Sequence, residues 1–540
     1  MSLRSRLAGA LSGLGRRVGR SPTLTTFTPT PGSMYDAGKV TRSDPDFIPP
    51  GMGVNVKNAR YLSLVQRRVA ALIDDSSLLS GARDSLRRNI IGQDGIYPQP
   101  KTGLPELNKK LTALWWKRRE AVDVGRELSM ALSQGQWFNQ LFPTGECLTH
   151  IPIVEAHRGY SAGPAIDLID SAARMDLSLT GTIGKNRVRQ GVEFDSLGRR
   201  VAYHVYAEDP RDADLSSGTF GVGVPMLGST GMTRIPAENA TLGFVNRWVN
   251  QIRGVPWPVT VTGSMRVMDA LIESELMLQR LKAATATWIE GAAGPVAKLK
   301  GTAGENANCA RDAYGNTVTR VEPGMIGYVP LNSKVHHYAN TAPGAGLQAT
   351  VSMLEQLIAV GLGMSYPNFS GDRSKSTFSS DRSGLLEERG QYREIQMLCW
   401  HQHTRGWWEA QVDWSILTGE LELDEQERAL YELERRQFFN CMVIARGYEW
   451  VNPAQEATAD RTALESGTKT HAVVCAGLGQ NWEDVFAQRV EEEKTWNEMR
   501  AKAGLDPAPV MQSSKPAAPA AGEAGGDKGD KAVDGGSSDE

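Results

Sequence analysis

Apolar residues recur at helical spacing along several stretches of the chain. Near its beginning, successive apolar positions are separated by three, four and three residues, which predicts one face of a helix starting near Tyr61: Leu62, Val65, Val69 and Leu72. The same kind of spacing predicts a helix at 347–362, a long helix at 381–412 and mostly helical structure from 419 to about 503. The chain therefore holds enough amphipathic helix to cover a large core.

The stretch from Ser264 to Ile289 is unusual because it contains neither Gly nor Pro and carries two apolar stripes. The first stripe is Met265, Met268, Ile272 and Leu276, and the second is Leu271, Leu278, Leu281 and Trp288. A helix with two stripes needs partners on more than one side. It is either buried in a large core or packed between two neighbours in an oligomer.

Strand patterns are confined to two parts of the chain. Residues 191–195 and 200–206 alternate apolar and polar positions on either side of the short turn Ser196-Leu197-Gly198, which predicts a β-hairpin. Short strands are also expected at 318–321 and 325–329. We expect residues 216–233, which are rich in Gly and lack charge, to form an exposed loop.

Composition limits the class of protein. The chain has 540 residues, of which 40% are hydrophobic and 22% charged, so it is neither wholly disordered nor a coiled-coil rod. No predominantly apolar run reaches the ~18 residues of a membrane span. The net charge of −3 does not indicate tight binding to DNA phosphates. Residues 1–60 are basic and proline-rich, which predicts a flexible arm, and residues 505–540 have the composition of a disordered tail.

Motifs for chemistry are weak throughout. Gly181 to Asn186 resembles a phosphate-binding loop only superficially, because the hydroxyl residue after Lys185 is replaced by Asn186 and the preceding Gly is too close. The clustered histidines, His336-His337 and His401-Gln402-His403, lack the spacing of a metal site. Five widely spaced cysteines suggest a reduced, cytoplasmic compartment without zinc. Acidic pairs such as Asp74-Asp75 are expected to be solvated. We therefore expect no enzyme activity, cofactor or metal.

The tryptophans between Trp400 and Trp414 have two possible roles. They could stack nucleic-acid bases, but they lie on an expected helix with apolar neighbours, which favours packing in the core.

Four groups of residues, in this order, resemble the lambda-type portal proteins of tailed bacteriophages over roughly 61–493. They are Ala82-Arg83-Asp84 with Arg88-Asn89 and Ile90-Ile91-Gly92; Ile235-Pro236-Ala237-Glu238-Asn239 with Gln251-Ile252-Arg253-Gly254-Val255-Pro256; Gly361-Leu362-Gly363-Met364-Ser365-Tyr366 with Phe378-Ser379-Ser380-Asp381-Arg382; and Trp450-Val451-Asn452-Pro453 with Gly479-Gln480-Asn481-Trp482-Glu483-Asp484-Val485. The sequence departs from the family at Phe378, usually Tyr, at Asn452, usually Asp, and before the long helix, where Trp248 and Val249 replace a polar approach.

The resemblance implies an α+β multi-domain portal fold. By similarity, residues 1–60 are an arm, 61–258 an α/β wing, 259–290 and 346–364 a stem of two helices, 291–345 a small β-containing clip, 365–379 a channel loop, 380–418 a long helix under the wing, 419–504 a helical crown and 505–540 a tail.

It also implies a homo-oligomeric ring, with twelve copies expected, at one capsid vertex. Double-stranded DNA would pass through it without sequence specificity, and it would dock the terminase large subunit, head completion or neck proteins and the major capsid or scaffold protein. It would be assembled in the host cytoplasm and reside in the virion.

Residues expected to act in these roles fall into three groups. The channel loop candidates are Asp372, Arg373 and Lys375. The clip candidates are Lys298, Lys300, Arg311 and Asp312. The candidates for stem packing between subunits are Met268, Leu271, Ile272, Leu278, Leu281 and Trp288.

Two other classes remain open. A terminase-like packaging enzyme would show ATPase or nuclease activity, and a coat or scaffold protein would form shells or filaments instead of closed rings with a central hole.

Overall fold

The computed structural model describes residues 51–506, except 212–230, 284–286, 292–308, 312–316, 320–325, 331–343, 375–376 and 449–452. The chain divides into two units, Met1–Val56 and Lys57–Glu540, and the account below concerns the second. The expected arm and tail lie largely outside the described residues, as does the expected loop at 216–233 apart from its last residues.

Four helices and one short strand precede the sheets: α2 (Val54–Asp75), α3 (Ser77–Ile90), β1 (Tyr97–Pro100), α4 (Pro105–Arg118) and α5 (Met130–Thr144). The predicted apolar face of the first helix is confirmed, since Leu62 and Val69 are buried. The helix begins at Val54, however, so the expected boundary near Tyr61 was wrong. Ser76 caps α3 by accepting a hydrogen bond from the amide of Leu79.

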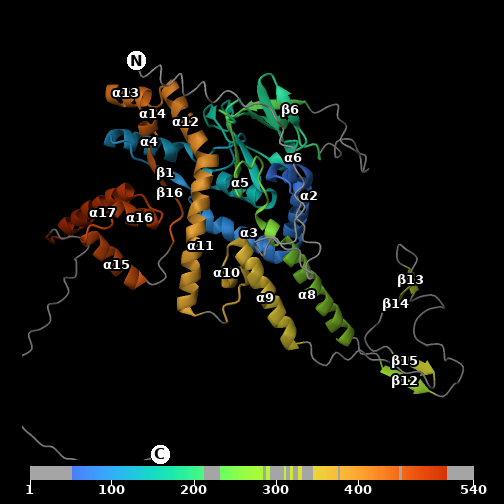
Figure 1. Cartoon of the computed structure of the whole chain (residues 1–540). Helices are drawn as coiled ribbons and strands as arrows, with labels where there is room; N and C mark the ends of the chain where they lie inside the picture. The colour runs from blue at the N-terminus through green and yellow to red at the C-terminus, as the bar shows by residue number, and fades with distance from the viewer. Residues whose placement is uncertain are drawn as a thin grey trace, which may run out of the picture. The chain divides into compact units, whose positions relative to one another are not determined.

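Two antiparallel sheets follow (Figure 1). The smaller has the strand order β11-β2-β5, with β2 at Glu146–His150, β5 at Asp167–Ile169 and β11 at Ala240–Phe244. The larger has the order β10-β9-β8-β7-β6, with β6 at Thr180–Ile183, β7 at Asn186–Arg189, β8 at Val192–Phe194, β9 at Arg200–Tyr206 and β10 at Met232–Pro236. Between β2 and β5 the short strands β3 (Ile153–Val154) and β4 (Gly163–Pro164) form an antiparallel pair of their own, and the short helix α6 (Ser171–Arg174) leads from β5 to β6.

The predicted hairpin is confirmed as β8–β9, in which Val192 pairs with Tyr203. The segment that resembles a phosphate loop is instead the hairpin β6–β7, where Ile183 pairs with Asn186 across a two-residue turn. Gly184 in that turn has a φ of +60°, a conformation that glycine adopts without strain.

After the short turn η2 (Trp257–Thr260) come two long helices, α8 (Thr262–Ala283) and α9 (Gly344–Leu362). The second agrees with the prediction. The first ends earlier than expected, because Thr287–Gly291 forms the strand β12, which pairs in parallel with β15 (Ile326–Pro330). A second pair is β13 (Cys309–Arg311) with β14 (Thr317–Thr319). The two short strands predicted near 318 and 325 are thus present, and Trp288 belongs to a strand instead of the stem helix.

A short helix, α10 (Tyr366–Ser370), precedes the long helical column of α11 (Phe378–Cys399) and α12 (Arg405–Leu417), drawn in yellow-orange and orange in Figure 1. The column confirms the long helix predicted at 381–412. A π-helical turn at Trp400–Thr404 joins its two halves. Within the expected loop at 365–379, Tyr366–Ser370 forms α10, and the described residues 371–374 and 377 lie between α10 and α11.

The C-terminal part is mostly helical, as predicted: α13 (Glu425–Leu433), α14 (Arg435–Phe438), α15 (Pro453–Glu465), α16 (His471–Gly477) and α17 (Trp482–Lys502). One strand in this part, β16 (Cys441–Ile444), was not predicted. It pairs antiparallel with β1, so that Tyr97 lies opposite Ile444. Residues far apart in the sequence thereby share one core.

The tryptophans of the long helix belong to that core. Trp400, Trp407 and Trp408 are buried, and the ring of Trp115 on α4 meets Trp407 and Trp408 edge-on at centroid distances of 5.9 and 5.4 Å. The structure supports core packing for these three side chains, the alternative that the sequence favoured.

Candidate functional site

The helices α8 and α9 pack against each other and against the main core. Met265 and Met268 on α8, and Ile358 and Leu362 on α9, are almost completely buried in this contact region. Gly361 permits close approach at the base of the pair, because a Cβ atom there would lie 2.3 Å from Cγ1 of Val261. The pair is therefore anchored at one end of each helix.

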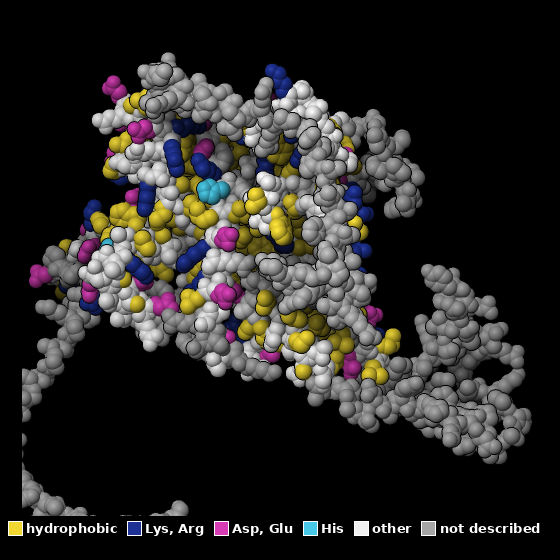
Figure 2. Space-filling model, in the orientation of Figure 1, with side chains coloured by type: hydrophobic (Ala, Val, Ile, Leu, Met, Phe, Trp, Pro, Cys, Tyr) yellow, Lys and Arg dark blue, Asp and Glu magenta, His cyan; other side chains and the backbone are white. Residues whose placement is uncertain are grey.

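The side of α9 opposite its buried face is also apolar. Met353, Leu357 and Val360 follow one another at intervals of four and three residues, so they form one stripe, and they are 58%, 55% and 78% exposed. Hydrophobic side chains are visible over α8 and α9 in Figure 2. A helix with apolar residues on two opposite faces usually packs against other structure on both faces. We call these three residues the α9 stripe.

The residues predicted to pack between the stem helices of neighbouring subunits differ in how far they are buried. Met268 is buried inside the chain's own core, so it is not available to a neighbouring copy. Leu271, Ile272 and Leu278 are half-buried, and Ile272 packs against the core. The side chains of Leu281 and Trp288 are outside the described residues. The α9 stripe was not predicted, although its spacing is readable in the sequence.

The candidate channel loop is a short polar segment, Gly371–Thr377, between α10 and α11. Asp372 stabilises its turn by accepting a hydrogen bond of 2.9 Å from the amide of Ser374. Arg373 is exposed in the same turn. Asp372 and Arg373 are adjacent in the chain and lie in the same turn, whereas Lys375 lies outside the described residues.

One buried carboxylate joins the helices on either side of this loop. Glu388 of α11 is 4% exposed and accepts hydrogen bonds from the amide of Ser365, from Nδ2 of Asn368 at 2.7 Å and from the hydroxyl of Tyr392 at 3.1 Å. Burial and the neighbouring negative charge of Glu388 raise the pKa of Tyr392, so its hydroxyl stays protonated and donates. The end of α9, α10 and α11 are therefore held at one point.

The clip candidates are mostly outside the described residues. This applies to Lys298, Lys300 and Asp312, while the backbone of Arg311 ends β13 and pairs with Thr317. Their expected role in docking stays a prediction.

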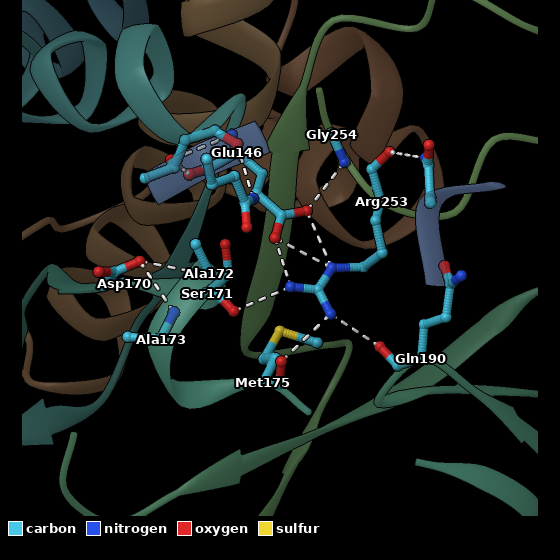
Figure 3. A network of polar contacts seen from close by, with 12 residues as sticks. Glu146, Asp170, Ser171, Ala172, Ala173, Met175, Gln190, Arg253 and Gly254 are labelled. Carbon is cyan, nitrogen blue, oxygen red and sulfur yellow. Dashed lines mark hydrogen bonds and ion pairs between the residues drawn. The ribbon is translucent and has the colours of Figure 1, made fainter. Parts of the chain in front are cut away.

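A buried ion pair positions the segment that leads into α8 (Figure 3). Glu146 and Arg253 are both fully buried, and Nε of Arg253 lies 2.9 Å from Oε2 of Glu146. The guanidinium also donates to the carbonyl oxygens of Ser171 at 2.8 Å and Gln190 at 2.9 Å, and the amide of Gly254 donates to Glu146 at 2.8 Å. One side chain thus connects β2, α6 and the end of β7.

Only glycine fits beside this pair. A Cβ atom on Gly254 would lie 2.1 Å from the carbonyl oxygen of Gly145, so the two backbones touch directly. These contacts explain why Arg253 and Gly254 occur next to each other in the Gln251–Pro256 motif. The motif was recognised in the sequence, but its role as a buried connection was not.

Within the described parts of the chain, no group of three or more His, Cys, Asp or Glu side chains is arranged to hold a metal ion. His403 lies in the π-helical turn, where burial lowers its pKa to about 3 and its Nε2 lies 3.1 Å from the hydroxyl of Ser133. His336 and His337 are outside the described residues. Of the helices described, none has the length and hydropathy needed to span a membrane.

Comparison with known sequences identifies the family. Residues 41–396 match the model of the family described as phage portal protein, lambda family. The chain is 24% identical over 416 residues to a probable portal protein of Halomonas phage phiHAP-1, covering 75% of each chain. It is 22% identical to portal protein B of Escherichia phage lambda, covering 59% of this chain and 60% of that one. It is 23% identical to the portal protein of Escherichia phage N15, covering 61% of this chain and 62% of the relative.

Among solved structures, a chain of the virion of a native gene transfer agent particle aligns over 71% of this chain and 94% of its own length, with 9% identity and a TM-score of 0.28. That likeness is too distant to support an argument. The family match covers well over half of the sequence and includes the buried pair, the two long helices and most of α11. The chain belongs to the lambda family of phage portal proteins.

Proposed function

We propose that copies of this chain assemble into a closed ring at one capsid vertex, twelve of them by analogy with the family. The hollow axis of the ring would conduct double-stranded DNA during packaging and ejection. The chain would catalyse no bond chemistry, and ATP hydrolysis would belong to the terminase.

The α9 stripe is the observation that carries this proposal. Fully burying one large apolar side chain contributes roughly 1.5–3 kcal/mol, so covering three that are more than half exposed would contribute several kcal/mol per contact. In a ring every α9 meets a neighbouring copy, which gives the stripe a partner without adding another protein.

The loop Gly371–Thr377 suits a channel lining. Arg373, Lys375 and Asp372 provide charge of both signs, and the net charge of the whole chain is −3. Strong phosphate binding would hold the DNA, whereas passage requires weak contacts without sequence specificity. An Arg373→Ala variant would remove one positive charge per subunit and should lower the salt dependence of DNA binding.

The remaining partners follow from family membership alone. The clip, with Lys298, Lys300, Arg311 and Asp312, would dock first the terminase large subunit and later the head completion or neck proteins. The outer part of the ring would contact the major capsid or scaffold protein. Assembly would occur in the host cytoplasm.

Electron microscopy of the purified chain tests the proposal, with mass photometry to count subunits. Closed rings with a central hole are expected. The Leu357→Asp variant should shift the population to monomers, because it places a charge in the stripe. Leu197→Asp is the matched control: Leu197 is 78% exposed in the turn of the β8–β9 hairpin, outside the stripe. A parent chain that stays monomeric contradicts the proposal, and ATPase or nuclease activity would instead indicate a packaging enzyme.

A further inference from the structure

The loop between β11 and η2 displays two large apolar side chains. Trp248 is 67% exposed and Val249 is 87% exposed, although the buried strand β11 ends only four residues before Trp248. Adjacent apolar residues with this exposure are uncommon on a surface that faces only water. We call Trp248 and Val249 the knob.

The fold holds this knob in a fixed conformation. The buried side chain of Gln251 accepts hydrogen bonds from the amides of Arg247 at 3.0 Å and Trp248 at 3.2 Å, and it donates to the carbonyl of Arg253 at 2.8 Å. Arg247 donates to the carbonyl of Trp257 at 3.0 Å. Because the loop is already ordered, binding of a partner to the knob costs little conformational entropy of the loop.

A groove of about 390 Å³, lined mainly by apolar residues, lies at another place on the same sheet. It is formed where β2 ends, where β11 begins and along α12, and its walls include Ile151, Pro164 and Trp414. Its rim carries Ile153 and Leu417, which are 66% and 82% exposed. The groove therefore offers apolar surface of the kind that would receive the knob.

The strand register places the knob and the groove at opposite ends of the sheet. Ala240 pairs with His150 beside the groove, and Phe244 pairs with Glu146 at the other end, four residues before Trp248. Four residues of strand span about 13 Å. A knob and a groove on opposite ends cannot meet within one copy, but they can meet in a head-to-tail series of copies.

The charges beside the two surfaces are also complementary. Glu238 lines the groove, and it forms no ion pair with any described residue. The guanidinium of Arg247, next to the knob, donates to backbone carbonyls and forms no ion pair within the described part of the chain either. A neighbouring copy would bring these opposite charges together.

We propose that the knob of one copy inserts into the groove of the next copy, as a contact of the ring in addition to the α9 stripe. This inference rests on the proposed ring, and it names the residues of a second interface within it. A tryptophan on an ordered loop is a common centre of binding energy in such contacts. The occupant of the groove is therefore a second copy of this chain.

Cysteine cross-linking of the full chain tests the proposal. Val249→Cys is combined with Ile153→Cys or with Leu417→Cys, two exposed residues of the groove, and the rings are treated with a short bismaleimide. Head-to-tail docking should give a ladder of covalent dimers, trimers and larger species on a denaturing gel. The three single variants are the controls for the natural cysteines and should give no ladder.

The other outcomes are decisive as well. Intact rings without a cross-link in either double variant would overturn the docking and leave the proposed ring standing, with the groove available to another protein. Cross-linking that stops at dimers would also overturn it, because a symmetric contact produces only pairs. Without a ring in the parent chain, both proposals fail.

A second measurement does not depend on added cysteines. Trp248→Asp should raise the concentration needed for half-assembly at least about tenfold. The fold should be unaffected, because the Trp248 side chain is largely exposed. The control Leu433→Asp changes a residue that is 82% exposed at the end of α13 and should assemble normally. Unchanged assembly of Trp248→Asp would contradict the proposal.

Discussion

Replacing Arg253 by Met should destabilise the chain severely. The change removes the only described cation beside Glu146, and both side chains are fully inaccessible to solvent. Removal of one partner of a buried ion pair costs about 3–5 kcal/mol, because an uncompensated charge stays buried. The carbonyls of Ser171 and Gln190 lose a charged donor as well, which keeps the expected loss in the upper part of that range.

The loss is measured as the change in the free energy of unfolding in urea. Arg253→Lys separates charge from geometry, because lysine keeps the charge but loses the planar fork, and we expect a smaller loss of about 2 kcal/mol. Arg199→Met is the control, since its pair with Asp195 is on the surface and its side chain is 75% exposed. A loss below about 1 kcal/mol for Arg253→Met would refute the role assigned to this pair.

Three further predictions concern single groups. The Arg234 guanidinium lowers the pKa of Glu193 from its ordinary 4.5 to about 2. Ionised Glu193 therefore stabilises the fold above pH 4.5, and this contribution is lost as the pH falls toward 2. In the Glu193→Gln variant, the free energy of unfolding should depend less on pH between 4.5 and 2. NMR should show that buried His403 titrates near pH 3, and a midpoint near 6.5 would contradict its burial. Glu388→Ala should increase amide hydrogen exchange from Ser365 through the channel loop, whereas Glu387→Ala, at an exposed neighbour, should leave it unchanged.

Periodicity was sufficient to predict the elements whose pattern is local. The helix containing Leu62 and Val69, the hairpin of Val192 and Tyr203, and the long helix through Trp407 all appear where apolar spacing indicated. Each of these elements is specified by the side chains that it buries, so the sequence itself contains the signal.

The errors occurred where the pattern had more than one structural solution. Apolar spacing continued through Trp288, but the chain pairs Thr287–Gly291 with β15, and hydrogen bonds to a distant strand are not visible in local spacing. For the same reason β16 was not predicted, because its hydrogen-bonding partner β1 lies more than 300 residues earlier in the chain. The short helix Tyr366–Ser370, whose Asn368 donates a hydrogen bond to Glu388, was not predicted either, because its residues lack apolar spacing.

The sequence by itself determined that this chain has two long apolar helices, a polar loop after them and the motifs of a phage portal protein. It could not decide which side of each helix faces its own core. Tertiary packing decided that Met268 is internal while Met353, Leu357 and Val360 face outward, because burial depends on which elements converge in space. Folding also brought Glu146 to Arg253, 107 residues away, and separated the knob from the groove. Contacts of this kind depend on topology, and topology is a property of the whole chain.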